Sequence, residues 1–243
     1  MAEYVTLKIF RYQPNVDTRP RFDTFQVRQR PGLMVLEALF DILEYQDASL
    51  AFRYSCRWGI CGSCAMHING RYRLACETRV EALGPEITVQ PLQHFPIIKD
   101  LVVDFEGFFE KLAQVQPYLM PGDDDPAKER LQSPAQRERT EDGAKCILCA
   151  CCQAACPMTL AHHAYLGPAV LLKLDRFHQD SRDDAKDLRL DLAEGEMGVW
   201  RCHTVFNCVE VCPKELHPAQ AISHLKQGLA RRKLFGWLRG RKR

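Results

Sequence analysis

At 243 residues, the chain is long enough for one large or two modest domains. Its formal net charge of +2 argues against a nucleic-acid-binding protein, and we expect no nucleic-acid partner. No stretch approaches the roughly eighteen apolar residues of a membrane span. The first residues, MAEYVTLKIF, lack a basic segment leading into an apolar run, so we expect no secretory signal and a compartment that keeps thiols reduced.

The N-terminal part of the chain has the pattern of a small sheet with one helix. Strands are predicted by alternating apolar residues over 4–12, 22–27, the hairpin AMHINGRYRL and 86–91. The hairpin turns at Asn69-Gly70, a pair typical of the type I′ turn. Apolar residues at helical spacing predict a helix between 33 and 45. Together these elements predict an α+β domain with a mixed sheet.

Beyond this region the pattern becomes helical. Residues 101–116 predict an amphipathic helix. Its predicted apolar face consists of Val102, Phe105, Phe109 and Leu112. An acidic loop, PGDDDPAKER, follows, and the clearest later helices are predicted over 170–177 and 219–229. We therefore expect two domains, residues 1–100 and residues 101–243.

The last thirteen residues, RRKLFGWLRGRKR, hold seven Lys or Arg and no acidic residue. A basic segment with an aromatic anchor such as Trp237 can contact anionic lipid or a membrane partner. A frayed terminus exposed to solvent can also be basic. The tail is therefore interpreted either as a contact with lipid or a membrane partner or as a solvated terminus.

Twelve cysteines are present, and their close spacing favours metal binding over disulfides. The first group has the spacing C-x4-C-x2-C with a later fourth cysteine, which is typical of a plant-type 2Fe–2S cluster. Its members are Cys56, Cys61, Cys64 and Cys76. Gly59 and Gly62 let the loop fold close to a cluster and direct N–H groups at it. A zinc site is the alternative, although zinc sites favour paired CxxC units.

Two further groups share a frame that ends in Cys-Pro. The first, KCILCACCQAACP, has the bacterial ferredoxin spacing, in which the fourth cysteine serves the other cluster of a pair. The second, RCHTVFNCVEVCP, has Val205 at the second cysteine position. We therefore expect a 4Fe–4S cluster on Cys146, Cys149, Cys152 and Cys212, and a 3Fe–4S cluster on Cys156, Cys202 and Cys208. Cys151 is out of phase and is predicted to be a packing residue.

Four segments together resemble the iron–sulfur subunit of succinate dehydrogenase and fumarate reductase, with the dehydrogenase branch closer. These segments are SCRWGICGSCAM, CILCACCQAACP, LGPAVLLKLDRFHQDSRDD and RCHTVFNCVEVCPKELHPAQAI. The resemblance covers essentially the whole chain. It implies an α+β fold, in which a plant-ferredoxin-like β-grasp domain precedes an all-α bacterial-ferredoxin-like domain.

The resemblance also implies a function and partners. The subunit would relay electrons from the FAD of a flavoprotein subunit through the 2Fe–2S, 4Fe–4S and 3Fe–4S clusters to a membrane quinone. A membrane anchor, which can carry haem, would hold it on the cytoplasmic face of the cell membrane or the matrix face of the inner membrane. The chain carries no catalytic acid–base motif or dicarboxylate site, so we expect no turnover from it alone.

The sequence departs from ubiquinone-using members after the Cys-Pro of the 4Fe–4S run. Those members carry aromatic residues there, including a tryptophan that resembles a quinone ligand, whereas this chain has Met158-Thr159-Leu160-Ala161. Menaquinone is therefore an option. Pro157 and His203 are the candidate quinone contacts, and a surface histidine against the anchor is the alternative for His203.

A related reductase with another acceptor, such as a thiol-linked or heterodisulfide reductase, is a second functional hypothesis. Such relatives usually carry two complete cysteine runs, and Val205 argues against this class. A zinc-stabilised scaffold without electron transfer is the third, and a brown colour of the pure protein would exclude it.

Overall fold

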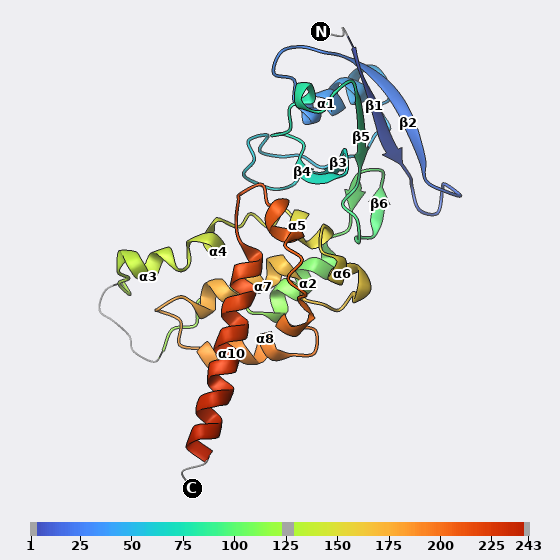
Figure 1. The fold of residues 1–243 in the computed structure, drawn as a ribbon. Helices are drawn as coiled ribbons and strands as arrows, with labels where there is room; N and C mark the ends of the chain where they lie inside the picture. Colours follow the sequence, from blue (N-terminus) through green and yellow to red (C-terminus); the bar gives the residue numbers. More distant parts are fainter. Residues whose placement is uncertain (1–3, 123–128, 241–243) are drawn as a thin grey trace. The chain divides into compact units, whose positions relative to one another are not determined.

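The computed structural model describes residues 4–122 and 129–240, with side chains described as far as residue 234. The chain forms two compact units (Figure 1). The first contains Met1–Phe105, Ile147–Ala155 and Val211–Pro213, and the second contains Glu106–Cys146, Cys156–Glu210 and Lys214–Arg243. The division into residues 1–100 and 101–243 stays a prediction.

The first unit is built on a mixed sheet with the strand order β2-β1-β5-β3-β4. Its strands are β1 (Tyr4–Arg11), β2 (Arg21–Arg28), β3 (Ala65–Ile68), β4 (Arg71–Leu74) and β5 (Glu86–Gln90). Strand β1 is antiparallel to β2 and parallel to β5, while β3 is antiparallel to both β4 and β5. The predicted hairpin at Asn69-Gly70 and the predicted mixed sheet are therefore confirmed.

Local sequence explains most of this unit. In β1 the alternate residues Val5, Leu7 and Ile9 are buried, as expected for a strand with one face in the core. The β3–β4 turn has φ of 45° at Asn69 and 76° at Gly70, the two positive values that a type I′ turn requires. Helix α1 (Val35–Tyr45) contributes the buried residues Val35, Leu36, Ala38, Leu39 and Ile42 to the core of the unit.

The segment predicted as one helix over 101–116 is divided. Strands β6 (Ile97–Lys99) and β7 (Val102–Val103) pair as a short hairpin, and helix α2 begins only at Glu106 and ends at Gln114. The predicted apolar face is wrong in part, because Val102 lies in β7 and Phe109 is 49% exposed. Leu112 is buried as predicted, and Phe108 and Val115 are buried with it at helical spacing.

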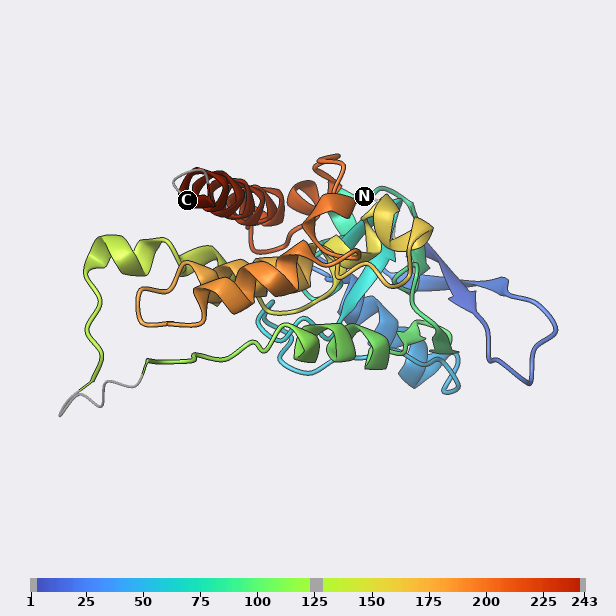
Figure 2. The same cartoon turned by 90° about the horizontal axis from the view of Figure 1, so that it is seen from below.

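The second unit is helical. Its helices are α2, α3 (Pro134–Glu138), α4 (Glu141–Lys145), α6 (Pro157–Ala161), α7 (Pro168–His178), α8 (Lys186–Glu194), α9 (Asn207–Glu210) and α10 (Pro218–Gly240). Helix α7 is largely buried and packs against α10, α4, α8 and α2, with α10 alongside it (Figure 2). The helices predicted over 170–177 and 219–229 are therefore confirmed.

Three short elements complete the description. Helix α5 (Cys151–Ala154) belongs to the first unit and packs against β4. The 3-10 turns are Val80–Ala82 in the first unit and Val199–Arg201 in the second.

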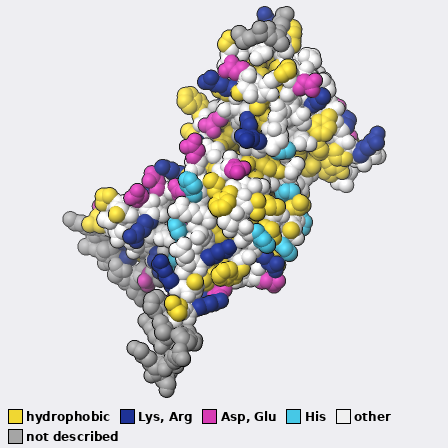
Figure 3. Space-filling model, viewed as in Figure 1, with side chains coloured by type: hydrophobic (Ala, Val, Ile, Leu, Met, Phe, Trp, Pro, Cys, Tyr) yellow, Lys and Arg dark blue, Asp and Glu magenta, His cyan; other side chains and the backbone are white. Residues whose placement is uncertain are grey.

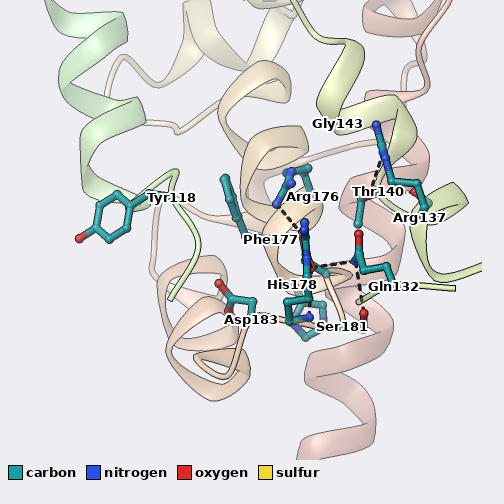
Figure 4. Close-up of polar contacts among 12 residues, drawn as sticks. Tyr118, Gln132, Arg137, Thr140, Gly143, Arg176, Phe177, His178, Ser181 and Asp183 are labelled. Atoms are coloured by element: carbon teal, nitrogen blue, oxygen red, sulfur yellow. Dashed lines mark hydrogen bonds and ion pairs between the residues drawn. The ribbon is translucent and has the colours of Figure 1, made fainter. Parts of the chain in front are cut away.

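Buried charges in the second unit are paired, as burial in a low-dielectric interior requires. The side chain of Asp180 is fully buried and accepts hydrogen bonds from Arg176 at 2.8 Å and Gln132 at 2.9 Å. Both donors are labelled in Figure 4. Arg189, also fully buried, pairs with Asp183 at 2.8 Å and donates to backbone carbonyls of the segment after α2. These hydrogen bonds and ion pairs hold the segment after α2 and the loop between α7 and α8 in place.

The surface carries mixed charge. Acidic and basic side chains are interspersed on the face in Figure 3. In the described part of the chain, no helix combines the length and apolar character needed to span a membrane. The acidic loop predicted at 121–130 lies largely outside the described residues, and so do the tail side chains from residue 235 onward.

Candidate metal centres

The predicted 2Fe–2S loop directs backbone N–H groups at cysteine sulfurs. The N–H groups of Ile60 and Cys61 each donate to Cys56 Sγ at 3.3 Å, and the N–H of Gly59 donates to Cys76 Sγ at 3.3 Å. Such hydrogen bonds stabilise negative charge on sulfur. The loop is therefore arranged to hold thiolates, as the sequence predicts.

Glycines at two positions of this loop make room for neighbouring groups. A Cβ on Gly59, whose φ is +63°, would lie 1.9 Å from Oε1 of Glu77. A Cβ on Gly62, whose φ is +74°, would lie 2.8 Å from Cβ of Cys149, which belongs to the same compact unit. Gly62 thus lets the plant-type loop pack closely against the first ferredoxin-type loop, while the predicted approach of both glycines to a cluster stays a prediction.

Thiol pKa values differ within the first group. Burial alone would raise the pKa of Cys61, but hydrogen bonds from Ser63 and the backbone of Cys56 lower it to about 6. Burial raises the pKa of Cys64 to about 12. The thiolate is the form of cysteine that binds metal. At neutral pH, Cys61 is therefore closer to its metal-binding form than Cys64 is.

Three of the four predicted 4Fe–4S ligands gather around Cys151 in the first unit. A hydrogen bond with Cys149, burial, and the nearby Cys152 and Cys212 hold the pKa of Cys151 well above its usual value. Cys151 is completely buried, in agreement with the predicted packing role. The fourth predicted ligand, Cys146, is the C-terminal cap of α4 and belongs to the second unit.

In both ferredoxin-type runs, a lysine binds the carbonyl of the first cysteine. Lys173 Nζ, on α7, donates to the carbonyl oxygen of Cys146 at 3.1 Å. Lys226 Nζ, on α10, donates to that of Cys202 at 2.9 Å. Each contact also leaves a positive charge beside its cysteine loop, where it would favour bound thiolates.

The two runs also share an unusual backbone. The positive φ values are 55° at Leu148, 63° at Ala150, 58° at Thr204 and 65° at Phe206. Each pair flanks one residue, Cys149 in the first run and Val205 in the second. Val205 therefore has the same backbone position in its loop as Cys149 has in the other.

The three predicted 3Fe–4S ligands line one pocket in the second unit. Cys156, Cys202 and Cys208 share its wall with Val205 and with Tyr165, which the sequence analysis missed. Burial, followed by the nearby Cys156 and Cys202, raises the pKa of Cys208 to about 11. The candidate quinone contacts, Pro157 and His203, line the same pocket.

The donor chemistry of these groups fits iron–sulfur clusters. All the predicted ligands are free thiols. Thiolate donors with N–H groups directed at sulfur are the protein's usual contribution to such clusters. Across the described ranges, no set of three or more His, Cys, Asp or Glu side chains is placed to hold a single metal ion.

Comparison with known proteins identifies both halves. Residues 6–110 match the family described as "2Fe-2S iron-sulfur cluster binding domain", and residues 139–213 match the "4Fe-4S dicluster domain". The succinate dehydrogenase iron–sulfur subunit of Paracoccus denitrificans is 44% identical over 90% of this chain and 85% of its own. The mitochondrial succinate dehydrogenase [ubiquinone] iron–sulfur subunit of Candida glabrata is 44% identical over 93% of this chain and 91% of its own.

The chain belongs to the succinate dehydrogenase iron–sulfur subunit family.

A solved structure supports the same family at the level of the fold. A chain of the Mycobacterium smegmatis Sdh1 complex in the apo form superposes with a TM-score of 0.88 at 30% identity, covering 96% of this chain and 98% of its own. The predicted family and α+β fold are therefore confirmed. As a succinate dehydrogenase iron–sulfur subunit, the chain is part of an oxidoreductase complex and carries 2Fe–2S and 4Fe–4S binding domains.

The sequence analysis missed side chains that act on the cysteine loops without belonging to a motif. Glu77, Lys173 and Lys226 are of this kind, together with Tyr165. Lys173 lies inside the segment LGPAVLLKLDRFHQDSRDD, which carries part of the family resemblance. Its place in that segment was the one sequence feature that could have indicated a functional role for it.

Proposed function

We propose that this succinate dehydrogenase iron–sulfur subunit relays electrons from the FAD of a flavoprotein subunit to a membrane quinone. The observation that carries the proposal is the pair of matching loops, one with Cys149 and one with Val205, beside a separate plant-type loop. A set of four cysteines suits a 2Fe–2S or 4Fe–4S cluster, and a set of three suits a 3Fe–4S cluster. When bound, such clusters accept and release single electrons at potentials that the protein adjusts.

The proposal assigns the cysteines to three ligand sets. The 2Fe–2S set is Cys56, Cys61, Cys64 and Cys76, the 4Fe–4S set is Cys146, Cys149, Cys152 and Cys212, and the 3Fe–4S set is Cys156, Cys202 and Cys208. Val205 occupies the missing-ligand position. Its side chain lines the pocket and offers no donor, so the third site holds three thiolates.

The proposed partners are a flavoprotein subunit and a membrane anchor, which can carry haem. Two exposed apolar side chains of the pocket of the third set support docking to an anchor: Val205 and Phe206 are 53% and 54% exposed. Apolar groups gathered on an otherwise polar surface commonly mark an interface. The resulting location is the cytoplasmic face of the cell membrane, or the matrix face of the inner membrane.

Quinone is proposed to bind beside the third set, with Pro157 and His203 as contacts because both line that pocket. The segment after Pro157 carries Met158 and Leu160 and no aromatic side chain. This composition supports menaquinone as an option. The quinone recovered from the purified membrane complex identifies the species directly.

Metal analysis and EPR of the complex test the assignment. We expect about nine irons per chain, from one two-iron, one four-iron and one three-iron cluster. Cys208→Ser should remove the 3Fe–4S signal alone, while Cys151→Ser, the matched control, should leave all three signals. Tightly bound zinc, or only two cluster signals, would contradict the proposal.

Activity measurements complete the test. The isolated chain should oxidise no succinate, because the flavin is expected in the partner. Succinate-dependent quinone reduction should appear only when the partner subunits are present. Turnover by the purified chain alone would contradict the role as a relay.

A further inference from the structure

Tyr165 has a buried hydroxyl that lacks a well-formed hydrogen bond. The side chain is 0% exposed, and its oxygen meets no described acceptor with good geometry, although the sulfur of Cys202 lies close enough to interact with it. Buried hydroxyl groups nearly always have a hydrogen-bond partner, because losing water without replacement is unfavourable. The hydroxyl therefore requires a better-placed acceptor than the described residues offer.

The position of this hydroxyl indicates the acceptor. Tyr165 lines the pocket that also contains Cys156, Cys202 and Cys208. A phenol with the ordinary tyrosine pKa of about 10 keeps its proton at neutral pH and is available as a hydrogen-bond donor.

The backbone holds Tyr165 in this place from both sides. Its own N–H donates to the carbonyl of His162 at 2.9 Å, and the N–H of Leu166 donates to the carbonyl of Met197 at 3.0 Å. Helix α7 begins shortly afterwards at Pro168, where proline favours the first turn. The ring is therefore fixed before any ligand enters the pocket.

We propose that the Tyr165 hydroxyl donates a hydrogen bond to a sulfur of the cluster held by Cys156, Cys202 and Cys208 and thereby raises the reduction potential of that cluster. The inference rests on the three-thiolate set of the proposed function. Reduction adds one electron, breaks no bond and leaves the proton on the phenol oxygen. A hydrogen-bond donor beside sulfur stabilises the reduced form more, because that form carries more negative charge.

Quinone is the competing acceptor in this pocket, and burial argues against it. The candidate quinone contacts Pro157 and His203 are exposed, whereas Tyr165 is completely buried. A membrane-soluble ligand that arrives from the exposed side would meet those two residues first. The cysteines line the same pocket as Tyr165, and Cys208 is buried like it.

Tyr165→Phe in the assembled complex tests the proposal by redox titration of the oxidised 3Fe–4S EPR signal. At the wild-type midpoint potential, the ratio of reduced to oxidised cluster should fall about tenfold, as expected for loss of one hydrogen bond to a charged group. This ratio corresponds to a midpoint about 59 mV lower. The 4Fe–4S midpoint should not move.

Tyr118→Phe is the matched control, because Tyr118 is 57% exposed, lies outside the pocket and donates from its hydroxyl to the nearby Gln116 at 3.4 Å. It should leave every midpoint unchanged. An unchanged midpoint in Tyr165→Phe, with full 3Fe–4S content, would overturn the inference. If that variant instead altered the KM for quinone alone, the hydroxyl would serve quinone and the inference would be wrong.

Replacing tyrosine with 3-fluorotyrosine provides a test that keeps the ring in place. The more acidic phenol is a stronger donor, so the 3Fe–4S midpoint should rise, opposite to the effect of phenylalanine. No rise would count against the hydrogen bond even if Tyr165→Phe failed to assemble. Absence of any 3Fe–4S signal in the wild-type complex would instead defeat the proposed function, and the two failures are thus distinguishable.

Discussion

Loops 146–152 and 202–208 have the same backbone conformation in different surroundings. In both, the central residue is flanked by two non-glycine residues with positive φ. That central residue is Cys149 in one loop, 9% exposed, and Val205 in the other, 53% exposed. A lysine binds the carbonyl of the first cysteine in each case.

The comparison teaches that loop shape and ligand number are specified separately. A non-glycine residue in the left-handed region costs roughly 1–2 kcal/mol. The second loop retains both such residues although its central side chain is no ligand. On the proposed ligand assignment, its backbone matches that of the four-thiolate loop, while one side chain sets how many thiolates it supplies.

Val205→Cys should have the largest effect, because it makes the second loop equal to the first. A fourth thiolate should convert the oxidised-state 3Fe–4S signal into a reduced-state 4Fe–4S signal at lower potential. Each lowering of about 59 mV shifts a one-electron equilibrium tenfold, so quinone reduction should slow by about tenfold or more. Succinate oxidation with an artificial dye should persist. An undiminished 3Fe–4S signal in folded, fully loaded protein would show that residue 205 does not occupy the ligand position.

Cys149→Val is the reciprocal change and should convert the 4Fe–4S site into a three-thiolate site. We expect a second oxidised-state 3Fe–4S signal and loss of the 4Fe–4S signal. Cys151→Ala, at the neighbouring buried thiol, is the control and should leave the cluster types unchanged. Retention of the 4Fe–4S signal in Cys149→Val would mean that Cys151 can serve as a ligand.

Phe206→Asp tests the difference in exposure between the loops. Phe206 is 54% exposed beside Val205, and burying a phenylalanine contributes about 1.5–3 kcal/mol. Attachment to the membrane partner should weaken roughly tenfold to a hundredfold, measured by the fraction of chain that sediments with membranes. Leu131→Asp is the control, since Leu131 is 82% exposed and lies outside the pocket. Equal release by both variants would contradict docking through this loop.

Ala150→Gly should have the smallest effect and the opposite sign. Glycine tolerates the φ of 63° at this buried position, so relief of strain should exceed its greater entropy loss. The free energy of unfolding should rise by about 0.5–1 kcal/mol in denaturation experiments. Ala154→Gly, in the following helix α5, should instead lower it by about 1 kcal/mol. A loss of stability in both variants would mean that the left-handed conformation at residue 150 is not strained.

The sequence predicted elements whose cause is local. Asn69-Gly70 predicted a hairpin because the turn needs two positive φ values, and the alternation in β1 predicted its buried face. The face of α2 was predicted wrongly, because Phe108 and Phe109 are equally apolar and only the tertiary packing decides which is buried. The ligand assignments themselves remain predictions that rest on spacing.

Contacts between distant segments had no local signal. Tyr165 is far from Cys202 in the sequence, and nothing in its own neighbourhood indicates that the two residues line one pocket. The contact between the Glu77 carboxylate and Gly59 could not be predicted either. A glycine in a loop indicates a turn, but it does not indicate which side chain packs against it. Such contacts follow from the folded arrangement of the chain.

Gly62 bears on the speed of electron transfer. A Cβ at this position would lie 2.8 Å from the Cβ and 2.9 Å from the Cα of Cys149, so a side chain as small as a methyl would force the two loops apart. Electron tunnelling slows steeply as donor and acceptor separate, even when their potentials stay the same. On the proposed ligand assignment, a substitution at residue 62 would therefore lengthen the tunnelling distance between the two loops and leave the driving force unchanged.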